Sequence, residues 1–352
     1  MTARLLCLNL GSSSLKFSVF EGEQRQRHGT IDEVGPSALA RALDATADAP
    51  VDAVVHRLVC GAPDSEPGRI DETLLAQLRA SVPLAPLHLP AAIAAIEQVA
   101  RQHPGMPQVA CFDTSFHRTL PAVARRLPIP EHLHTDGLSR RGFHGLSCEH
   151  VVATLGAALP PRTVVAHLGQ GASLTAIRDG RSVDTTMGLT PTGGIPMGTR
   201  TGDLDPGLLV HLLRHRGLSL EALDRLVTHE GGLLAVGGSS SMVTLLDRRA
   251  HDARAALAVD LFVMSVRKAI GALTAVLGGL DLLVFTGGIG EHAAPVRAEV
   301  CAGLGFLGLH LDPTRNEHHD ERLEAEGGSV SIRRVVAEED RVMARHARRC
   351  LG

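Results

Sequence analysis

Apolar runs of strand length alternate along the chain with longer amphipathic segments. The short runs predict strands at 5–10, 16–20, 52–56, 107–112, 162–168, 172–178 and 281–286. The amphipathic segments predict helices near 71–80, 90–102, 145–157, 206–216, 219–228, 252–277, 292–303 and 338–350. This alternation predicts an α/β fold in which helices cover the sheets. Segment 180–202 is rich in Gly, Thr and Pro, lacks periodicity, and is predicted to be a long functional loop.

Composition narrows the class of protein. A chain of 352 residues is long enough for two domains with filled cores. The net charge of −3 and the lack of a basic run give no indication of nucleic acid or an anionic membrane as partner. We expect no signal peptide and no membrane span. The six cysteines lack metal-type spacing, so we expect buried thiols in a reducing cytoplasm: Cys7, Cys60, Cys111, Cys148, Cys301 and Cys350.

The first candidate site lies in the segment LLCLNLGSSSLKFSVF, residues 5–20, which is predicted to form strand, Gly/Ser turn and strand. A phosphate laid over such a turn meets backbone N–H groups, hydroxyls such as that of Ser12, and the cation of Lys16. Asn9, at the strand end, can orient a metal-bound water. An ordinary hairpin turn is the alternative. The segment is not a Walker A loop, because the second glycine before the lysine is missing and no helical pattern follows.

Two charged residues end predicted strands. Arg57 comes two residues after the apolar pair Val54–Val55, and a buried arginine is costly unless it meets an anion. A phosphate or carboxylate ligand would satisfy it, as would an internal salt bridge. Asp113 ends the strand predicted at 107–112, where ligands gather in open α/β sheets. Capping of a following helix is the alternative role for Asp113.

Four glycine-rich segments follow. His144 lies between glycines, which leaves its ring free of shielding and able to reach a ligand. Residues 167–171 are predicted to form a second phosphate turn between strands. Arg200 lies on a loop before Asp205, which with Pro206 predicts the start of a helix. Residues 284–291 read as a strand, a glycine turn and a helix, a weak signal for nucleotide binding.

Nine segments, in order between residues 5 and 345, carry one resemblance: NLGSSSLKFSVF, HRLVCG, PLAPLHLP, FDTSFH, RGFHGLS, HLGQGAS, MGLTPTGGIPMGTRTGDLDPG, FTGGIGE and AEEDRVMAR. Together they resemble the acetate kinases of the actin, sugar kinase and heat-shock chaperone superfamily. The resemblance implies two actin-like, ribonuclease H-like domains with an active-site cleft between them. It places the N-terminal domain at 1–118 with 340–352, holding the acyl substrate and phosphate loop. The C-terminal domain, 119–339, would bind nucleotide and form a homodimer.

The resemblance also implies ATP or ADP as co-substrate, Mg²⁺ as cofactor with Mn²⁺ as a substitute, and a role for each matching residue. Asn9 and Glu339 match metal-binding positions, and Arg57 matches the arginine that holds the carboxylate. Asp113, His144 and Arg200 match the catalytic positions. Ser12 and Lys16 match nucleotide-binding positions, as do His167, Leu168, Gly169, Gln170, Gly171, Met242, Val243, Thr244, Gly288, Ile289, Gly290, Glu291 and His292. The pocket for the substrate methyl would be lined by Val59, Leu87, Phe143 and Pro191.

The chemistry agrees with this assignment. Phosphoryl transfer needs alignment and positive charge around three equatorial oxygens, which Arg57, His144, Arg200 and Mg²⁺ would supply. A carboxylate nucleophile is already ionised at neutral pH, since its pKa is near ~4, and has no proton to lose. We therefore interpret Asp113 as a group that orients Mg²⁺ and the arginines rather than as a base. We expect the glycine-rich loop 193–202 to become ordered on domain closure.

Departures from the family pattern lie at the nucleoside end. Gln170 replaces the usual Asn, and Met242 and Thr244 replace an Asp and an Arg near the adenosine. His292 replaces an Asn, and the stretch between residues 20 and 52 is shorter than usual. An ATP-dependent acetate kinase is the favoured function. The alternatives are an acyl kinase that uses propionate, butyrate, pyrophosphate or GTP, and a non-catalytic actin-like nucleotide sensor.

Overall fold

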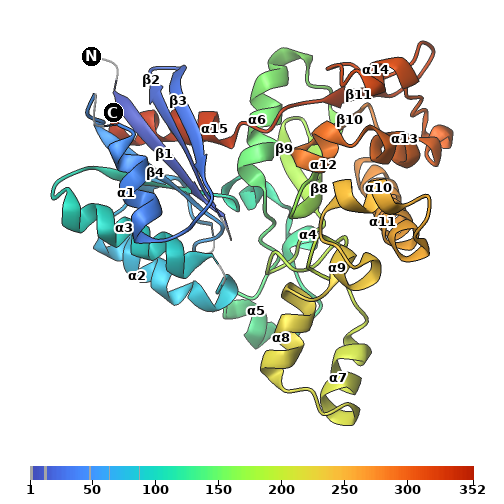
Figure 1. The fold of residues 1–352 in the computed structure, drawn as a ribbon, viewed down its shortest axis with the longest axis horizontal. Coiled ribbons are helices and arrows are strands. Elements are labelled where there is room, and N and C mark those ends of the chain that lie inside the picture. Colours follow the sequence, from blue (N-terminus) through green and yellow to red (C-terminus); the bar gives the residue numbers. More distant parts are fainter. Residues whose placement is uncertain (1–2, 12–13, 47–48, 63, 87) are drawn as a thin grey trace. The chain divides into compact units, whose positions relative to one another are not determined.

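The computed structural model of the chain describes residues 3–11, 14–46, 49–62, 64–86 and 88–352. The chain forms two compact units (Figure 1). The first comprises Met1–Arg118, Phe143–His150 and Glu338–Gly352, and the second comprises Thr119–Gly142 and Val151–Ala337. Residues 143–150 and 338–339, which the sequence-based division places in the C-terminal domain, therefore lie in the first unit.

The first unit is built on a six-stranded sheet of order β3-β2-β1-β4-β6-β5. Antiparallel strands form one half of it, and β4 and β6 run parallel to β1 in the other half. Parallel strands place their carboxyl ends at one edge of the sheet, which is where ligands gather in such folds. The strands are β1 (Arg4–Leu10), β2 (Leu15–Glu21), β3 (Gln24–Ile31), β4 (Ala53–Leu58), β5 (Gly68–Arg69) and β6 (Gln108–Phe112).

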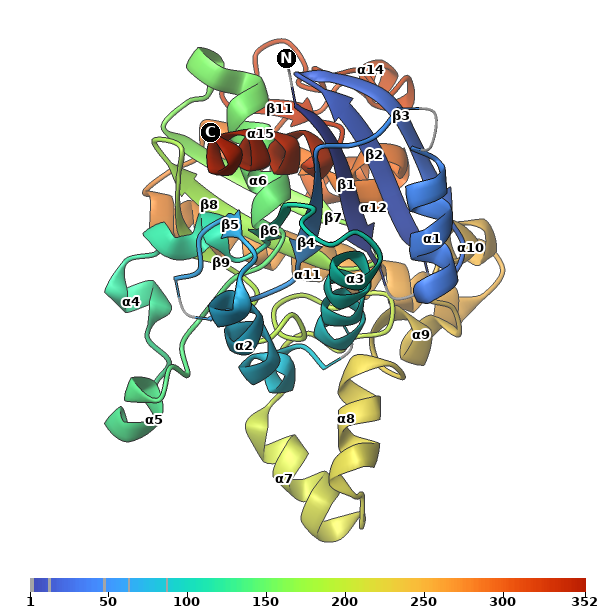
Figure 2. The same ribbon diagram turned by 90° about the vertical axis from the view of Figure 1, so that its left-hand side faces the viewer.

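Helices cover both faces of this sheet (Figure 2). On one face, alternate residues of β1 such as Leu6 and Leu8 pack in the core with α1 (Pro36–Asp44) and α3 (Leu89–Gln102). On the other, Leu5 and Cys7 pack against α15 (Glu339–Leu351). Alternation with a period of two divides each strand between the faces. The further helices are α2 (Glu72–Ala80) and α6 (Gly145–Leu155), which begins in the first unit.

The second unit repeats the strand order of the first. Its sheet, read from the antiparallel edge, has the order β9-β8-β7-β10-β11, with β10 and β11 parallel to β7. The β7–β8 turn therefore corresponds to the β1–β2 turn, and the end of β10 corresponds to the end of β4. The strands are β7 (Arg162–Leu168), β8 (Ala172–Arg178), β9 (Arg181–Thr185), β10 (Leu282–Thr286) and β11 (Ser331–Arg334).

The long helix α11 (Ala253–Leu277) packs on β7 and β8 of the second sheet. Its N-cap is Asp252, and it ends at Gly278, which adopts a left-handed conformation. Helices α7 (Pro206–His215) and α8 (Leu220–Thr228) form a hairpin that projects from the rest of this unit and buries none of its residues (Figure 1). The others are α4 (Ala122–Arg125), α5 (Glu131–Thr135), α9 (Gly232–Gly237), α10 (Met242–Arg248), α12 (Gly287–His292), α13 (Ala294–Ala302) and α14 (Pro313–Glu317).

The predicted α/β fold is confirmed, and each predicted strand and helix has a counterpart in the structure. The sequence analysis missed β3, whose residues are mostly exposed and polar because it is an edge strand. It also missed β9, which interrupts the loop predicted at 180–202. The glycine turn predicted within 284–291, between the strand and the helix, is wrong: α12 begins at Gly287, directly after β10, and a break at Ala293 separates it from α13. Asp205 caps α7 as predicted, since its carboxylate accepts the N–H of Gly207.

None of the described helices is both long and apolar enough to cross a lipid bilayer. All six cysteines lie in the described residues and none forms a disulfide; five are buried and Cys350 is half-buried. Burial raises the pKa of Cys7 and of Cys111 well above the usual range of a thiol. Both side chains therefore remain protonated core groups.

Candidate active site

The β1–β2 turn places two of the candidate residues side by side. The N–H of Gly11 donates to the carbonyl of Ser14 at 2.8 Å and closes the turn. Asn9 and Lys16 are directly opposed across the antiparallel pair, so their side chains share one face of the sheet. Asn9 is half-buried and Lys16 is exposed. Ser12, predicted to bind nucleotide, lies outside the described residues.

The alternation of the strands brings Asn9, Arg57 and Asp113 to one face at the carboxyl ends of β1, β4 and β6. In register, Cys7 pairs with Val55, and Arg57 pairs with Cys111. Odd-numbered residues of the three strands thus face the same way, toward α15. The thiols of Cys7 and Cys111 contact the carbonyls of Asp340 and Met343 on that helix, at 3.8 Å in each case. Glu339, the first residue of α15, lies at the same end of this face.

Arg57 and Asp113 form a fork-shaped ion pair. Nε of Arg57 donates to Oδ1 of Asp113 at 2.9 Å, and Nη2 donates to Oδ2 at 2.8 Å. Nη1 lies 4.0 Å from a carboxylate oxygen of Glu339. The side chains of Arg57, Asp113 and Glu339 are 17%, 3% and 15% exposed. The sequence left open whether Arg57 meets an internal acid or an external anion, and the structure shows the internal pair.

The charges around Arg57 fix its protonation. Burial lowers the pKa of the guanidinium, but the negative charges of Asp113 and Glu339 outweigh burial and raise the pKa above its usual value. The arginine therefore keeps its charge in a buried place. Two of its five N–H bonds point at Asp113, so the others can donate to an anion.

A close backbone approach sets His144 beside Asp113. The N–H of Gly145, at the start of α6, donates to the carbonyl of Asp113 at 2.8 Å. A Cβ at Gly145 would lie 2.2 Å from that same oxygen, so only glycine fits. His144 adopts a left-handed conformation with φ of 57°, an uncommon state for a residue with a side chain. Strain of this kind clusters at functional sites.

The residues predicted to line the methyl pocket divide between the units. Phe143, in the first unit, is 1% exposed, and its carbonyl bonds to Nε2 of His117 at 2.9 Å. Val59, which follows β4, is half-buried. Pro191 belongs to the second unit, and Leu87 lies outside the described residues.

In the second unit the β7–β8 turn lies against the start of α12. The last residues of the parallel strands are in register, with Thr286 beside His167. A Cβ at Gly287 would lie 2.8 Å from the carbonyl of Leu168, and Gly287 has a φ of +76°. A Cβ at Gly169 would lie 3.7 Å from the backbone nitrogen of Gly288. The two predicted nucleotide segments are therefore neighbours, packed too closely at Gly287 for a side chain.

The residues that depart from the family pattern differ in how far they are exposed. Met242 is 4% exposed, so its side chain belongs to the core of the unit. Val243 and Thr244, the next residues of α10, are exposed, as is Gln170. The carbonyl of Gln170 accepts the N–H of Gly198 at 3.4 Å, which joins the β7–β8 turn to the glycine-rich loop. His292 is exposed, with its ring 6.2 Å from that of His319.

The loop that carries Arg200 is held by backbone hydrogen bonds. The N–H of Met197 donates to the carbonyl of Arg200 at 3.0 Å, and Asp203 accepts the N–H of Gly194 at 2.8 Å. Nη1 of Arg200 donates to the carbonyl of Pro191 at 3.0 Å and contacts Sδ of Met197 at 3.7 Å. In the described part of the chain, Arg200 forms no ion pair, and desolvation lowers its pKa. A desolvated guanidinium of this kind suits a bound anion.

Sequence reasoning missed Arg297 on α13, which is fully buried. Its Nη1 donates to the carbonyls of Gly290 and Glu291 at 2.9 Å each, at the end of α12. Nε donates to Oδ1 of Asn316 at 2.7 Å. Burial lowers the pKa of Arg297 to about 10. Arg297 thus fixes the candidate nucleotide helix from behind; a single arginine in a helical pattern gives no sequence signal for this role.

The oxygen donors of the first unit fit Mg²⁺ in kind. In the described ranges, no three His, Cys, Asp or Glu side chains group as a metal site. Mg²⁺ is usually held by one or two carboxylates together with waters and substrate phosphates. Asn9 and the Glu339 carboxylate, which lies at the end of the sheet face that carries Asn9, are donors of that type.

Two units with the same strand order, with charged residues and glycine turns at the strand ends, place the chain in the two-domain actin-like class. The model of the acetokinase family matches residues 36–345. An acetate kinase of Nitrobacter hamburgensis is 38% identical over 383 residues, covering 97% of this chain and 95% of that protein. An acetate kinase of a Synechococcus species is 44% identical over 306 residues, covering 84% of this chain and 76% of that protein.

Solved structures agree. The acetate kinase of Porphyromonas gingivalis has a TM-score of 0.88 at 31% identity and covers 99% of this chain and 100% of its own. A propionate kinase of Francisella tularensis has a TM-score of 0.89 at 30% identity, with 98% of both chains covered. The chain therefore belongs to the acetokinase family, whose members are phosphotransferases with a carboxyl group as acceptor.

Proposed function

We propose that this protein catalyses reversible phosphoryl transfer between ATP and acetate, giving acetyl phosphate and ADP by direct in-line transfer with Mg²⁺. The observation that carries the proposal is the Arg57–Asp113 fork at the carboxyl ends of β4 and β6. It presents a permanently charged guanidinium, fixed in orientation, where an α/β sheet binds ligands. Family membership supplies the reaction class.

Arg57 binds the carboxylate substrate in this proposal. Asp113 holds one edge of the guanidinium, and the remaining N–H bonds meet the acetate oxygens. Acetate is ionised at neutral pH and needs no base. Asp113 therefore acts by orienting Arg57 and the metal rather than by removing a proton.

His144 and Arg200 stabilise the transferring phosphoryl group. The position of His144 is fixed through Gly145 and the Asp113 carbonyl, and that of Arg200 through Pro191 and Met197. A preorganised donor of this type contributes about 2.7–4 kcal/mol to lowering the barrier. The loop 193–202, which holds Arg200, excludes water from the transferring phosphoryl group when substrates bind.

Asn9 and Glu339 hold the metal, and the turns 167–171 and 288–292 with Lys16 hold the nucleotide. When bound, Mg²⁺ neutralises charge on the phosphate oxygens. Lys16, opposite Asn9, adds a cation on the same face. Gly169 and Gly287 allow the close backbone approach at the nucleotide turns. The departures at Gln170 and Thr244, both exposed, favour a relaxed choice of phosphoryl donor as a second candidate.

The reaction class leaves open whether acetate or propionate is the preferred substrate. One similar structure is a propionate kinase and another an acetate kinase. One methylene changes binding in an apolar pocket by only about 1–3 kcal/mol. We assign acetate because the resemblance puts Val59, Phe143 and Pro191 at the positions that line the methyl pocket of the acetate enzymes.

We also propose a cytoplasmic homodimer. None of the six cysteines, all of which lie in the described residues, forms a disulfide, which fits a reducing compartment. Leu257, Leu261 and Met264 are spaced as one stripe of α11, and each is at least a third exposed. A second copy of the chain would cover this stripe.

An acyl-hydroxamate assay tests the function. Acetate, propionate and butyrate are crossed with ATP, GTP and pyrophosphate, each with Mg²⁺, and Arg57→Met serves as the matched loss-of-binding control. We expect acetate with ATP to give the highest kcat/KM. A higher value with propionate or pyrophosphate would replace the substrate assignment, and no hydroxamate with any pair would overturn the proposal.

A further inference from the structure

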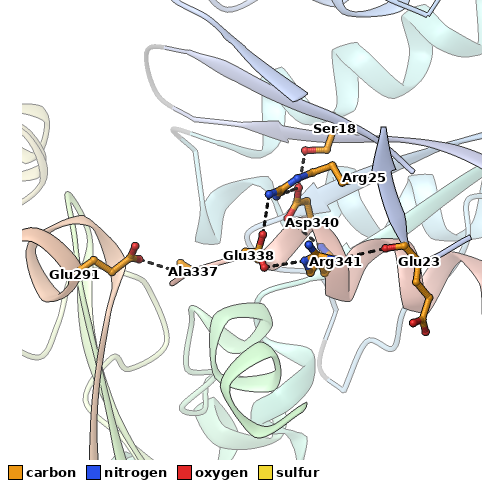
Figure 3. A network of polar contacts seen from close by, with 8 residues as sticks. All are labelled: Ser18, Glu23, Arg25, Glu291, Ala337, Glu338, Asp340 and Arg341. Carbon is orange, nitrogen blue, oxygen red and sulfur yellow. Dashed lines mark hydrogen bonds and ion pairs between the residues drawn. The ribbon is translucent and has the colours of Figure 1, made fainter. Parts of the chain in front are cut away.

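The side chain of Glu291 turns back onto the backbone of its own unit. It is 6% exposed, although it lies in the glycine-rich segment that resembles a nucleotide-binding turn. Its Oε1 accepts the N–H of Gly287 at 3.0 Å. The same oxygen accepts the N–H of Ala337 at 2.9 Å (Figure 3). One carboxylate oxygen therefore joins the first residue of α12 to Ala337, which lies 46 residues beyond Glu291 along the chain.

The residues that follow Ala337 are held from the other side. Glu338 pairs with Arg25 at 2.8 Å and accepts a hydrogen bond from Arg341 at 2.7 Å (Figure 3). Asp340 accepts from Oγ of Ser18 at 2.5 Å. Of the three successive acids, the first and third are thus tied to the β2–β3 region and to α15 itself. Glu339, between them, is the one that approaches Arg57.

We infer that Glu291 is a positioning residue that couples the nucleotide helix α12 to the metal-binding Glu339. The inference rests on the proposed function and deepens it. Glu291 fixes the backbone of Ala337, which is two residues before Glu339. A movement of α12 therefore shifts the position of the Glu339 carboxylate. Arg25 and Arg341 limit how much of that change residues 338–340 can absorb.

The competing role for Glu291 is direct contact of its carboxylate with nucleotide or metal. The substitution Glu291→Gln distinguishes this role from the positioning role. Both hydrogen bonds of Glu291 end on Oε1, and an amide oxygen can accept the same two N–H groups. Glu291→Gln therefore keeps the positioning contacts and removes the charge. Glu291→Ala removes both. Asp252→Ala is the matched control, because Oδ1 of Asp252 also accepts two backbone N–H groups, at the start of α11.

The experiment measures the half-saturating Mg²⁺ concentration, KM for ATP and for acetate, and, without turnover, the binding of ADP by calorimetry with and without Mg²⁺. We expect Glu291→Ala to raise half-saturating Mg²⁺ about tenfold, the low end of the effect of removing a group that orients a metal ligand. It should reduce the Mg²⁺ enhancement of ADP binding and leave the acetate KM within about twofold. Relative to Glu291→Ala, Glu291→Gln should recover most of the Mg²⁺ dependence, because it keeps both hydrogen bonds. Thermal unfolding of each variant reports on folding.

Two results would overturn the inference. If Glu291→Gln is as damaging as Glu291→Ala, the charge itself acts on the ligand. If Glu291→Ala lowers kcat and every affinity together, or only matches Asp252→Ala, its role is structural. A wild-type protein that binds Mg²⁺ and ADP but forms no acyl phosphate would contradict the proposed function alone, because the calorimetric comparison still stands.

Discussion

Removal of the Asp113 carboxylate should have a large effect on stability as well as on activity. In the folded protein Arg57 is 17% exposed and Asp113 is 3% exposed, and two hydrogen bonds of 2.9 and 2.8 Å join them. In Asp113→Ala the guanidinium keeps its charge but loses its main counter-charge. Breaking a buried pair of this kind costs about 3–5 kcal/mol. We therefore expect the free energy of unfolding to fall by about that amount.

A double-mutant cycle separates the pair from its surroundings. Arg57→Met removes the cation, and the double variant Arg57→Met/Asp113→Ala removes both members of the fork. Urea unfolding should show the double variant to be less destabilised than the sum of the single variants, by more than about 1.5 kcal/mol. Additive single effects would refute the claim that the two side chains act as a unit.

Kinetics of the same variants test the role of Asp113. Asp113→Asn keeps the shape and one acceptor oxygen, so it should fold, raise the acetate KM through a loosened Arg57, and shift the Mg²⁺ dependence. If Asp113→Asn loses activity with the Mg²⁺ dependence unchanged, the metal-orienting part of the account is wrong. A proton-transfer role would instead appear as a pH-dependent kcat that Asn abolishes.

Three further predictions follow from single residues. Arg200→Ala should lower kcat by about 10²–10³-fold, the effect of losing one preorganised donor. The free energy of unfolding in urea should change little, since Arg200 forms no ion pair in the described residues. A kcat within fivefold of wild type would contradict this prediction. Burial lowers the pKa of His117 to about 4 in the folded protein, against 6.5 for the unfolded chain. Its contribution to stability is therefore present above pH 6.5 and is lost as the pH falls toward 4, by roughly 3 kcal/mol in all. His117→Gln should reduce the dependence of the unfolding free energy on pH, measured by urea unfolding between pH 7 and 5. An unchanged pH dependence would rule out His117 as its source. Gly145→Ala should cost activity and stability because its Cβ would lie 2.2 Å from the Asp113 carbonyl, whereas Gly271→Ala, where a Cβ meets nothing within 4 Å, should be neutral or stabilising by up to about 1 kcal/mol; equal melting temperatures for the two would contradict the steric argument.

The regular elements could be predicted because their apolar periodicity is local. Strands such as β7 and β8 carry continuous apolar runs, and the predicted bounds match the observed ones. The edge strand β3 has no such pattern, because solvent rather than a core covers most of its residues. The helical state of Gly287–His292 could not be predicted either, because glycine propensity favours a turn and Glu291 and Arg297 hold the helix from distant positions.

Candidate chemistry was predictable at strand ends but its pairing was not. Arg57 and Asp113 each end an apolar run, which is visible in the sequence. That they form a fork depends on the registers of β4 and β6, which only the fold supplies. Met242 shows the reverse case: alignment to a ligand-binding position suggested a lost polar contact, and the structure places its side chain in the core.

The most direct test of the account follows the terminal phosphoryl group of ATP by ³¹P nuclear magnetic resonance, in the presence of Mg²⁺ and with or without acetate. Wild-type protein should give acetyl phosphate and ADP only when acetate is present, and Arg57→Met should need far more acetate for the same signal. Release of inorganic phosphate with no acetyl phosphate, at a rate indifferent to acetate, would contradict the assignment of Arg57 as the carboxylate-binding residue of a kinase.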